Sequence, residues 1–244
     1  MKTLVAPVLW TTRRSNADYW LLAACGPVLL GAALVGWRLS WLSASTAALC
    51  FFLLAALVAR YSGTRRLRIA DLVTLARGLG VCFLAGFTLQ ALAGGLARNG
   101  VLAMIIMGTL CLMLDGVDGR VARARGEATA FGARFDVETD AAMLIVLSIA
   151  VAALGIAGWW VLAIGAMRYC YVATSLVVPA LRTSLPYRYS GKVIAVVQAV
   201  ALLAALAFGL AQGAHWLPTI LLLAALASLC WSFGRSVLWQ MRQS

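Results

Sequence analysis

Residues 114–140 read LDGVDGRVARARGEATAFGARFDVETD, and this stretch holds six of the eight acidic residues of the 244-residue chain. Asp115 and Asp118 are three residues apart, and Asp136 and Asp140 are four apart. On a helix, either spacing places both side chains of a pair on one face. The short connection between the two pairs favours antiparallel neighbours. We therefore expect two adjacent helices whose carboxylate pairs face each other.

Outside this stretch the chain is strongly apolar. Hydrophobic residues make up 64% of the sequence and charged residues 11%, and the mean hydropathy is +0.95. This composition is typical of a polytopic helical membrane protein and differs from that of an ordinary globular domain. The six cysteines lie in apolar stretches without a CxxC pair, which argues against a disulfide framework or a zinc site.

Hydropathy predicts how often the chain crosses the membrane. A transmembrane helix needs about 20 mostly apolar residues, because the hydrocarbon core is about 30 Å thick. Two long runs are divided at the turn-forming sequences GIAGWW and GAHWLP. The fold class expected is all-α, with eight spans: 19–37, 39–59, 78–97, 99–114 continuing through 122, two within 141–181, and two within 193–234.

The basic residues predict the orientation. Sixteen of the 20 Lys and Arg residues fall on one side of the eight-span arrangement, against Arg38 and Arg98 on the other. Positive residues mark the cytoplasmic side. We therefore expect both termini and the acidic stretch in the cytoplasm, with the chain in the inner (plasma) membrane of a bacterium. The net charge of +12 requires no nucleic acid, and anionic membrane lipids and phosphorylated substrates are the expected partners.

The acidic stretch has the chemistry of a metal site. Four ionised carboxylates held close together would repel one another by several kcal/mol at an effective dielectric constant of about 20. Divalent cations relieve this repulsion, and oxygen ligands without His or Cys favour Mg²⁺ or Mn²⁺. The candidate ligands are Asp115, Asp118, Asp136 and Asp140.

The same stretch can accommodate a phosphate group. Glycines at 116, 119, 126 and 132 permit close approach of a bulky phosphate to the backbone, and Arg123 can pair with its charge. Metal, phosphate and arginine together indicate phosphoryl-type transfer. Glu127 and Glu138 are expected to be solvated.

The complete spacing resembles a known signature. It runs Asp115-x2-Asp118-Gly119-x2-Ala122-Arg123-x8-Gly132-x3-Asp136-x3-Asp140, and it matches the CDP-alcohol phosphatidyltransferase family at all eight specified positions. The resemblance implies a catalytic core of six transmembrane helices over residues 65–244. Residues 1–64 would then be an N-terminal extension with two further transmembrane helices.

The resemblance also implies an activity. Members transfer a phosphatidyl-type group from a CDP-lipid, such as CDP-diacylglycerol, to an alcohol and release CMP, usually as homodimers with a cytoplasmic active site. Carried over by position, the motif aspartates hold a two-metal site, and Asp140 is also the base that deprotonates the acceptor hydroxyl. The implied cytidine-diphosphate pocket contains Gly119, Ala122, Arg123 and Gly132.

A weaker resemblance involves DLVTLARG, residues 71–78, which is similar to the NxLTxxR entry to the first core helix. Thr74 and Arg77 match that pattern and are implied to line the nucleotide pocket, while Asp71 replaces the asparagine.

The acceptor alcohol is less strongly indicated. Arg168 interrupts a 41-residue run without any other charge, so it should face a polar cavity and bind the acceptor or an acidic partner. Arg134, Arg188 and Lys192 could complete a pocket for a phosphorylated polyol such as glycerol 3-phosphate or inositol 1-phosphate. The alternatives are a neutral or amino alcohol, such as serine or a lipid alcohol, or a divalent-cation transporter.

Overall fold

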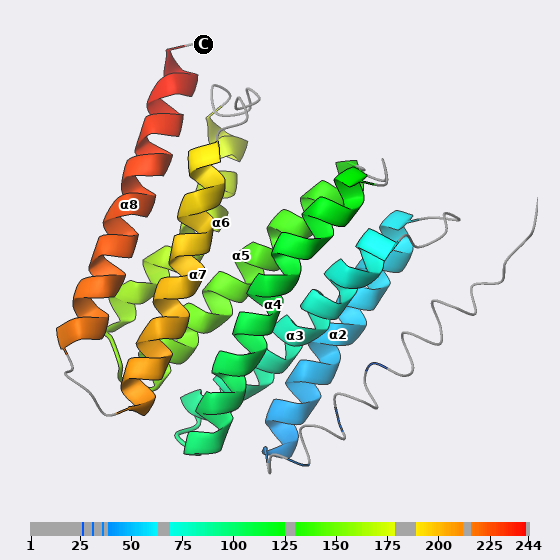
Figure 1. The fold of residues 1–244 in the computed structure, drawn as a ribbon, viewed down its shortest axis with the longest axis vertical. Coiled ribbons are helices and arrows are strands. Elements are labelled where there is room, and N and C mark those ends of the chain that lie inside the picture. The colour runs from blue at the N-terminus through cyan, green and yellow to red at the C-terminus, as the bar shows by residue number, and fades with distance from the viewer. Residues whose placement is uncertain are drawn as a thin grey trace, which may run out of the picture.

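The computed structural model describes residues 39–62, 69–124, 130–178, 189–211 and 216–242, together with the single positions 26, 31 and 36. These ranges form α-helices and one short 3-10 helix, without any strand among them, which confirms the all-α prediction (Figure 1). The elements are α2 (Trp41–Ser62), α3 (Ile69–Leu92), α4 (Arg98–Ala124), α5 (Ala130–Ala153), η1 (Trp159–Val161), α6 (Leu162–Val177), α7 (Tyr189–Leu210) and α8 (Trp216–Met241).

Among the described residues, five helices are long and apolar enough to cross a membrane. Their apolar segments are Leu75–Leu92, Arg98–Gly116, Trp159–Val177, Val193–Leu210 and Trp216–Met241. The chain is therefore an all-α integral membrane protein, as its composition predicts.

The other predicted spans differ in their outcome, so the total of eight stays a prediction. Span 19–37 lies outside the described residues apart from single positions. Span 39–59 corresponds to α2, whose described apolar part, Trp41–Ala56, is shorter than a full crossing. The first span predicted within 141–181 is the second part of α5, and the acidic residues of that helix lie in its first half.

Several predicted helix limits agree with the structure, whereas the predicted span 78–97 begins nine residues after the start of α3 and ends five residues after its end. The helix that carries Asp115 was expected to continue through Ala122, and α4 ends at Ala124. The GIAGWW turn separates α5 from η1, and Gly155 there has a φ of +67°, a left-handed conformation that glycine adopts without strain. The division predicted at GAHWLP agrees with the end of α7 at Leu210 and the start of α8 at Trp216.

Four helices surround the centre of the bundle. Both α3 and α7 pack against α4 and against α5. The helices α4 and α5 run antiparallel, as predicted, but each packs more closely with α3 than with the other (Figure 1). Small residues allow this arrangement, because Gly80 of α3 lies against Cys111 and Met107 of α4. The expectation of α4 and α5 as direct packing neighbours therefore needs correction. The two helices have few direct contacts with each other, and α3 and α7 each pack against both of them.

The core and the outer helices follow from this arrangement. Fully buried residues of five helices form the main core: Leu84, Met104, Leu147, Leu202, Leu206 and Leu222. A smaller cluster of Ala47, Phe51 and Cys82 joins α2 to the outer side of α3. The helix α8 packs on α7, and α6 packs on α5.

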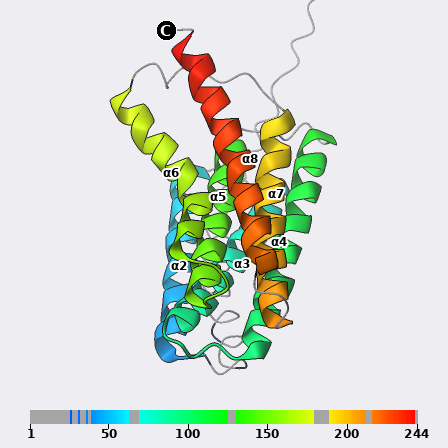
Figure 2. The same cartoon turned by 90° about the vertical axis from the view of Figure 1, so that its left-hand side faces the viewer.

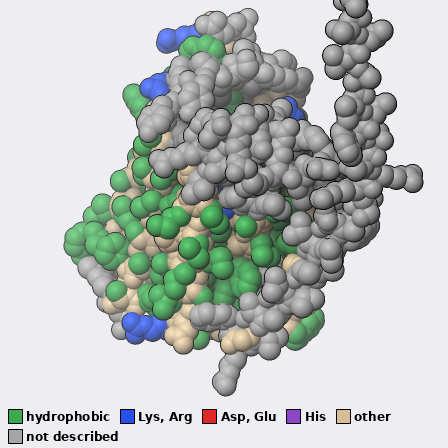
Figure 3. Space-filling model, turned by 45° about the vertical axis from the view of Figure 1, so that its right-hand side comes forward, with side chains coloured by type: hydrophobic (Ala, Val, Ile, Leu, Met, Phe, Trp, Pro, Cys, Tyr) green, Lys and Arg blue, Asp and Glu red, His purple; other side chains and the backbone are tan. Residues whose placement is uncertain are grey.

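The surface has the character expected in a bilayer. Hydrophobic side chains cover the middle of the described surface in Figure 3, and most of the visible Lys and Arg side chains lie toward its ends. The C-terminal end of α6 leans away from the bundle (Figure 2), and Leu176 and Val177 there are exposed. Apolar side chains exposed along membrane-spanning helices are suited to contact with lipid.

Candidate functional site

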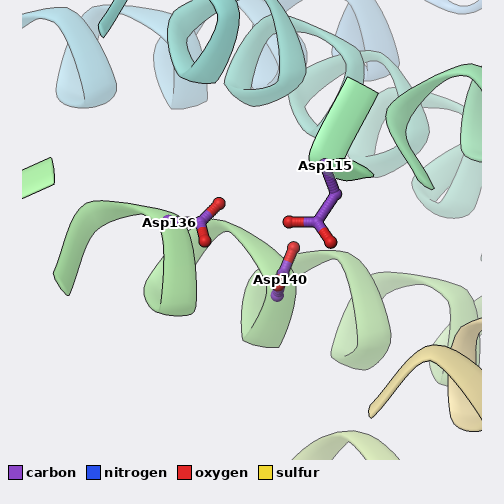
Figure 4. A group of neighbouring side chains, drawn as sticks. All are labelled: Asp115, Asp136 and Asp140. Carbon is purple, nitrogen blue, oxygen red and sulfur yellow. The ribbon is translucent and has the colours of Figure 1, made fainter. Parts of the chain in front are cut away.

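Three aspartates meet between the C-terminal half of α4 and the N-terminal half of α5. Asp115 of α4 points toward Asp136 and Asp140 of α5 (Figure 4). One carboxylate oxygen from each residue lies within 4.8 Å of the other two. Asp136 and Asp140 are one helical turn apart, which explains why both face the same neighbour. The structure thus brings together three of the four aspartates that the spacing singled out.

The aspartates differ in burial. Asp115 is only 8% exposed, whereas Asp136 and Asp140 are half-buried. Asp115 stands one residue before the end of the apolar segment Arg98–Gly116. The cluster therefore lies at the edge of the apolar layer, where a polar ligand can reach it from the membrane surface.

Arg77 of α3 occupies the middle of this cluster. Its Nη1 donates a hydrogen bond to Asp136 Oδ1, and its Nη2 donates one to Asp140 Oδ1. The same Nη1 lies 3.2 Å from Asp115 Oδ1. Arg77 is only 1% exposed, and its charge is compatible with this depth because three carboxylates surround it.

The backbone at Arg77 is held by close packing. The thiol of Cys111 on α4 lies 3.7 Å from the Arg77 carbonyl oxygen, which it can reach as a weak donor. A Cβ added to the next residue, Gly78, would lie 2.4 Å from Leu54 of α2. Helices α2 and α4 thus both contact α3 at the point from which the guanidinium extends.

The donor set fits a hard divalent cation. Asp115, Asp136 and Asp140 offer carboxylate oxygens from two helices within a small volume, which is the type of ligand that Mg²⁺ and Mn²⁺ prefer. The cluster contains no sulfur or imidazole ligand in the part of the chain that is described. These residues could therefore hold a metal, and two of them, Asp136 and Asp140, each accept a hydrogen bond from Arg77 through Oδ1.

Several predicted site residues cannot be placed at the level of their side chains. Arg188 lies outside the described residues. The backbones of six others belong to described helices, but their side chains are outside the description: Thr74 on α3, Asp118, Gly119, Ala122 and Arg123 on α4, and Lys192 on α7. Gly132 is half-buried and Arg134 is exposed, both in the first turns of α5.

Arg168 has an acidic partner. Its Nη2 donates a hydrogen bond to Glu138 Oε1, and about a third of its side chain is exposed. Helical periodicity turns Glu138 about 200° from Asp136, so this ion pair faces away from the aspartate cluster. Of the two roles expected for Arg168, the structure provides the acidic partner. Glu138 is exposed, in agreement with the expectation of a solvated residue, and in addition it forms this ion pair.

Sequence reasoning missed the position of Arg77 and two polar contacts between helices. Arg77 was expected to line a nucleotide pocket, and the sequence did not indicate that its guanidinium lies among the candidate metal ligands. Tyr171 of α6 donates a hydrogen bond of 2.7 Å to the buried Gln240 of α8. Gln198 of α7 donates one of 2.9 Å to the Ala225 carbonyl oxygen of α8. The available signal was a polar side chain inside an apolar run.

Comparison with known proteins identifies the family. The model of the CDP-alcohol phosphatidyltransferase family matches residues 67–231. Two proteins of Mycobacterium tuberculosis, from strains CDC 1551 / Oshkosh and ATCC 25618 / H37Rv, are each named "Probable phosphatidylglycerophosphate synthase" and are 32% identical to this chain over 139 residues. The alignment covers 56% of this chain and 66% of each relative. No solved structure matches the chain. Because the family match includes more than half of the sequence, the chain belongs to the CDP-alcohol phosphatidyltransferase family.

Proposed function

We propose that this protein is a membrane enzyme of phospholipid biosynthesis that transfers a phosphatidyl group from a CDP-lipid to an alcohol and releases CMP. The convergence of Asp115, Asp136 and Asp140 within 4.8 Å, on the two helices that carry the family's motif, is the observation that carries this proposal. CDP-diacylglycerol is the proposed lipid. The proposal includes a homodimer in a bacterial inner membrane with its active site in the cytoplasm, supported by the arginine distribution and by the family.

Asp115, Asp136 and Asp140 would hold the divalent cation, with Asp118 as the fourth carboxylate of the motif. When bound, such a cation polarises phosphate oxygens and stabilises the attacking and leaving oxygens of a displacement at phosphorus. The position of the cluster at the end of an apolar segment supports its use on a lipid diphosphate, whose head lies at the membrane surface.

The protein's own residues then account for the proton and the orientation. Asp140 takes the proton of the acceptor hydroxyl. The acceptor oxygen forms a bond to the phosphorus next to the lipid, and the bond from that phosphorus to the bridging oxygen breaks. That oxygen and its electron pair leave with CMP. Gly119, Ala122, Arg123, Gly132 and Thr74 are proposed to receive the cytidine diphosphate, because of their motif positions.

We propose a phosphorylated polyol as the acceptor, with glycerol 3-phosphate first. The name of the mycobacterial relatives supports this choice, as do the basic residues Arg134, Arg188 and Lys192 near the predicted cytoplasmic surface. Arg168 contributes less to this argument than the sequence suggested, since Glu138 already balances its charge. A neutral acceptor such as serine would not need these cations.

The direct test is CMP release by the full-length protein in lipid nanodiscs that contain CDP-diacylglycerol. Glycerol 3-phosphate, inositol 1-phosphate, serine and glycerol are offered separately, with Mg²⁺, Mn²⁺ or EDTA. We expect metal-dependent release that is fastest with a phosphorylated polyol. We expect Asp140→Asn to lower kcat by about 10²–10⁴-fold, the range for loss of a general base. Wild-type turnover by Asp140→Asn would remove that residue as the base, and failure with every acceptor would refute the activity.

A cation transporter is the alternative from another functional class. It predicts Mn²⁺ flux into sealed liposomes without any nucleotide. Arg77 counts against it, because a positive charge among the three carboxylates would repel a permeant cation. Flux that does not require CDP-lipid would favour the transporter over the transferase.

A further inference from the structure

We infer that Arg77 and the divalent cation are alternative occupants of one carboxylate cluster, so that cation binding displaces the Arg77 guanidinium from Asp115, Asp136 and Asp140. This inference rests on the proposed function in one respect, namely that the cluster binds a divalent cation. It adds a residue that sets the cation affinity of the site from within the protein.

The geometry carries the first step. The guanidinium contacts the same three residues whose oxygens form the candidate metal site, and it reaches each of them through Oδ1. A cation coordinated by these residues would lie among oxygens that are all within 4.8 Å of one another. The space between them accommodates either a guanidinium or a coordinated cation.

Charge carries the second step. A divalent cation and a guanidinium repel each other twice as strongly as two unit charges at the same distance, and burial weakens the screening by water. Arg77 is almost fully buried, so little solvent separates it from the cluster. Joint occupation is therefore disfavoured, and the free energy of cation binding must include the loss of the three Arg77 contacts.

The fixed backbone determines what kind of movement this requires. Gly78 packs against Leu54 of α2, and Gly80 packs against Cys111 of α4, so α3 has close neighbours on two sides at this level. The smallest movement that frees the carboxylates is a rotation of the arginine side chain about its own flexible stem. A buried guanidinium needs another anion once it leaves the carboxylates, and phosphate oxygens of the substrate are a suitable partner.

The experiment is isothermal titration of Mn²⁺ into the full-length protein in detergent, without any nucleotide or lipid substrate. We expect Arg77→Gln to bind Mn²⁺ at least about tenfold more tightly than wild type, because a positive charge in contact with the ligands is removed. We also expect Arg77→Gln to melt at a lower temperature than wild type in EDTA. Addition of Mn²⁺ should raise the melting temperature of Arg77→Gln by more than it raises that of wild type.

Arg98→Gln is the matched control. It also removes one arginine charge from the protein, but Arg98 is exposed at the opposite end of α4. Seventeen residues separate it from Asp115, or about 25 Å along a helix. Its Mn²⁺ affinity should equal that of wild type. A tenfold gain in this variant too would show a general charge effect and would overturn the inference.

Other outcomes separate this inference from the proposed function. Unchanged or weaker Mn²⁺ binding by Arg77→Gln, with normal binding by wild type, overturns the inference and leaves the metal site intact. Absence of Mn²⁺ binding in both proteins overturns the inference and the proposed metal site together. If Arg77→Gln does not fold, Arg77→Met decides: it also removes the positive charge, so it should bind Mn²⁺ more tightly than wild type, and equal affinity contradicts the inference.

Discussion

At the scale of single residues, the site depends on the balance between three carboxylates and one guanidinium. Arg77 lies in contact with Asp115, Asp136 and Asp140, and each group makes the burial of the others tolerable. A second arginine, Arg168, pairs with Glu138 on the other side of α5. The two ion pairs share a helix but differ in burial, so they should respond differently to mutation.

Asp115 should be the least replaceable of the described carboxylates. We expect Asp115→Asn to weaken Mn²⁺ binding by about 10–100-fold or more, because loss of even a supporting group at a metal site has an effect of that size. Titration calorimetry of the purified variant measures this change. Wild-type affinity would show that Asp115 does not ligate the metal.

Glu138→Gln should have a much smaller effect. Glu138 is 55% exposed, and an exposed ion pair contributes about 0–1 kcal/mol. We therefore expect the free energy of unfolding to fall by less than about 1 kcal/mol and Mn²⁺ affinity to remain unchanged. Chemical denaturation and calorimetry provide the two measurements. A marked loss of Mn²⁺ affinity would place this residue in the metal site.

The sequence predicted the convergence of Asp115, Asp136 and Asp140, but it did not predict where Arg77 lies. Spacings of three and four residues identify a shared helical face, so the sequence alone identified the pairs Asp115/Asp118 and Asp136/Asp140. Arg77 is separated from Asp140 by 63 positions, and its contacts exist only because α3 packs against both α4 and α5. A charge inside an apolar span signals a role without identifying its partners.

At the scale of helices, glycines decide how closely neighbours approach. A Cβ added to Gly165 of α6 would lie 2.4 Å from the Ile145 Cα of α5. This Cα is a backbone atom, so it cannot rotate out of the way as the end of a side chain could. We expect Gly165→Ala to destabilise the protein by about 1–3 kcal/mol, the usual cost of overpacking. Thermal unfolding in detergent measures this effect.

Gly234 on α8 provides the control for this substitution, since an added Cβ there meets nothing within 4 Å. Gly234→Ala should alter stability by no more than about 1 kcal/mol, the difference in helix propensity. Equal loss of stability in both variants would contradict the close packing of α6 on α5.

Helix limits were more predictable than helix neighbours. The turn at Gly155 and the extension of α4 beyond Asp115 follow from local features: glycine permits a positive φ, and apolar residues precede the charged end. The packing of both α3 and α7 against α4 and α5 depends on the surfaces of four helices. A short connection between two consecutive helices predicts that they run antiparallel. It does not show whether they pack directly against each other or mainly against a third helix.

At the scale of the whole molecule, the proposed orientation places Arg242 in the cytoplasm and Arg98 on the opposite side. Both are exposed near the ends of described helices. In a background that lacks the exposed native cysteines, we expect a membrane-impermeant thiol reagent to label Arg98→Cys in intact spheroplasts and Arg242→Cys only after lysis. Labelling of Arg242→Cys in intact cells would reverse the topology.

For the whole molecule, the proposed function makes one requirement: the carboxylates from α4 and α5 must hold a divalent cation against the substrate diphosphate. The most direct measurement is anomalous diffraction at the manganese absorption edge, from crystals grown with Mn²⁺ and CDP-diacylglycerol. We predict a peak among Asp115, Asp136 and Asp140, about 2 Å from their oxygens and beside the diphosphate. A bound CDP-lipid without manganese density at these aspartates would contradict the account.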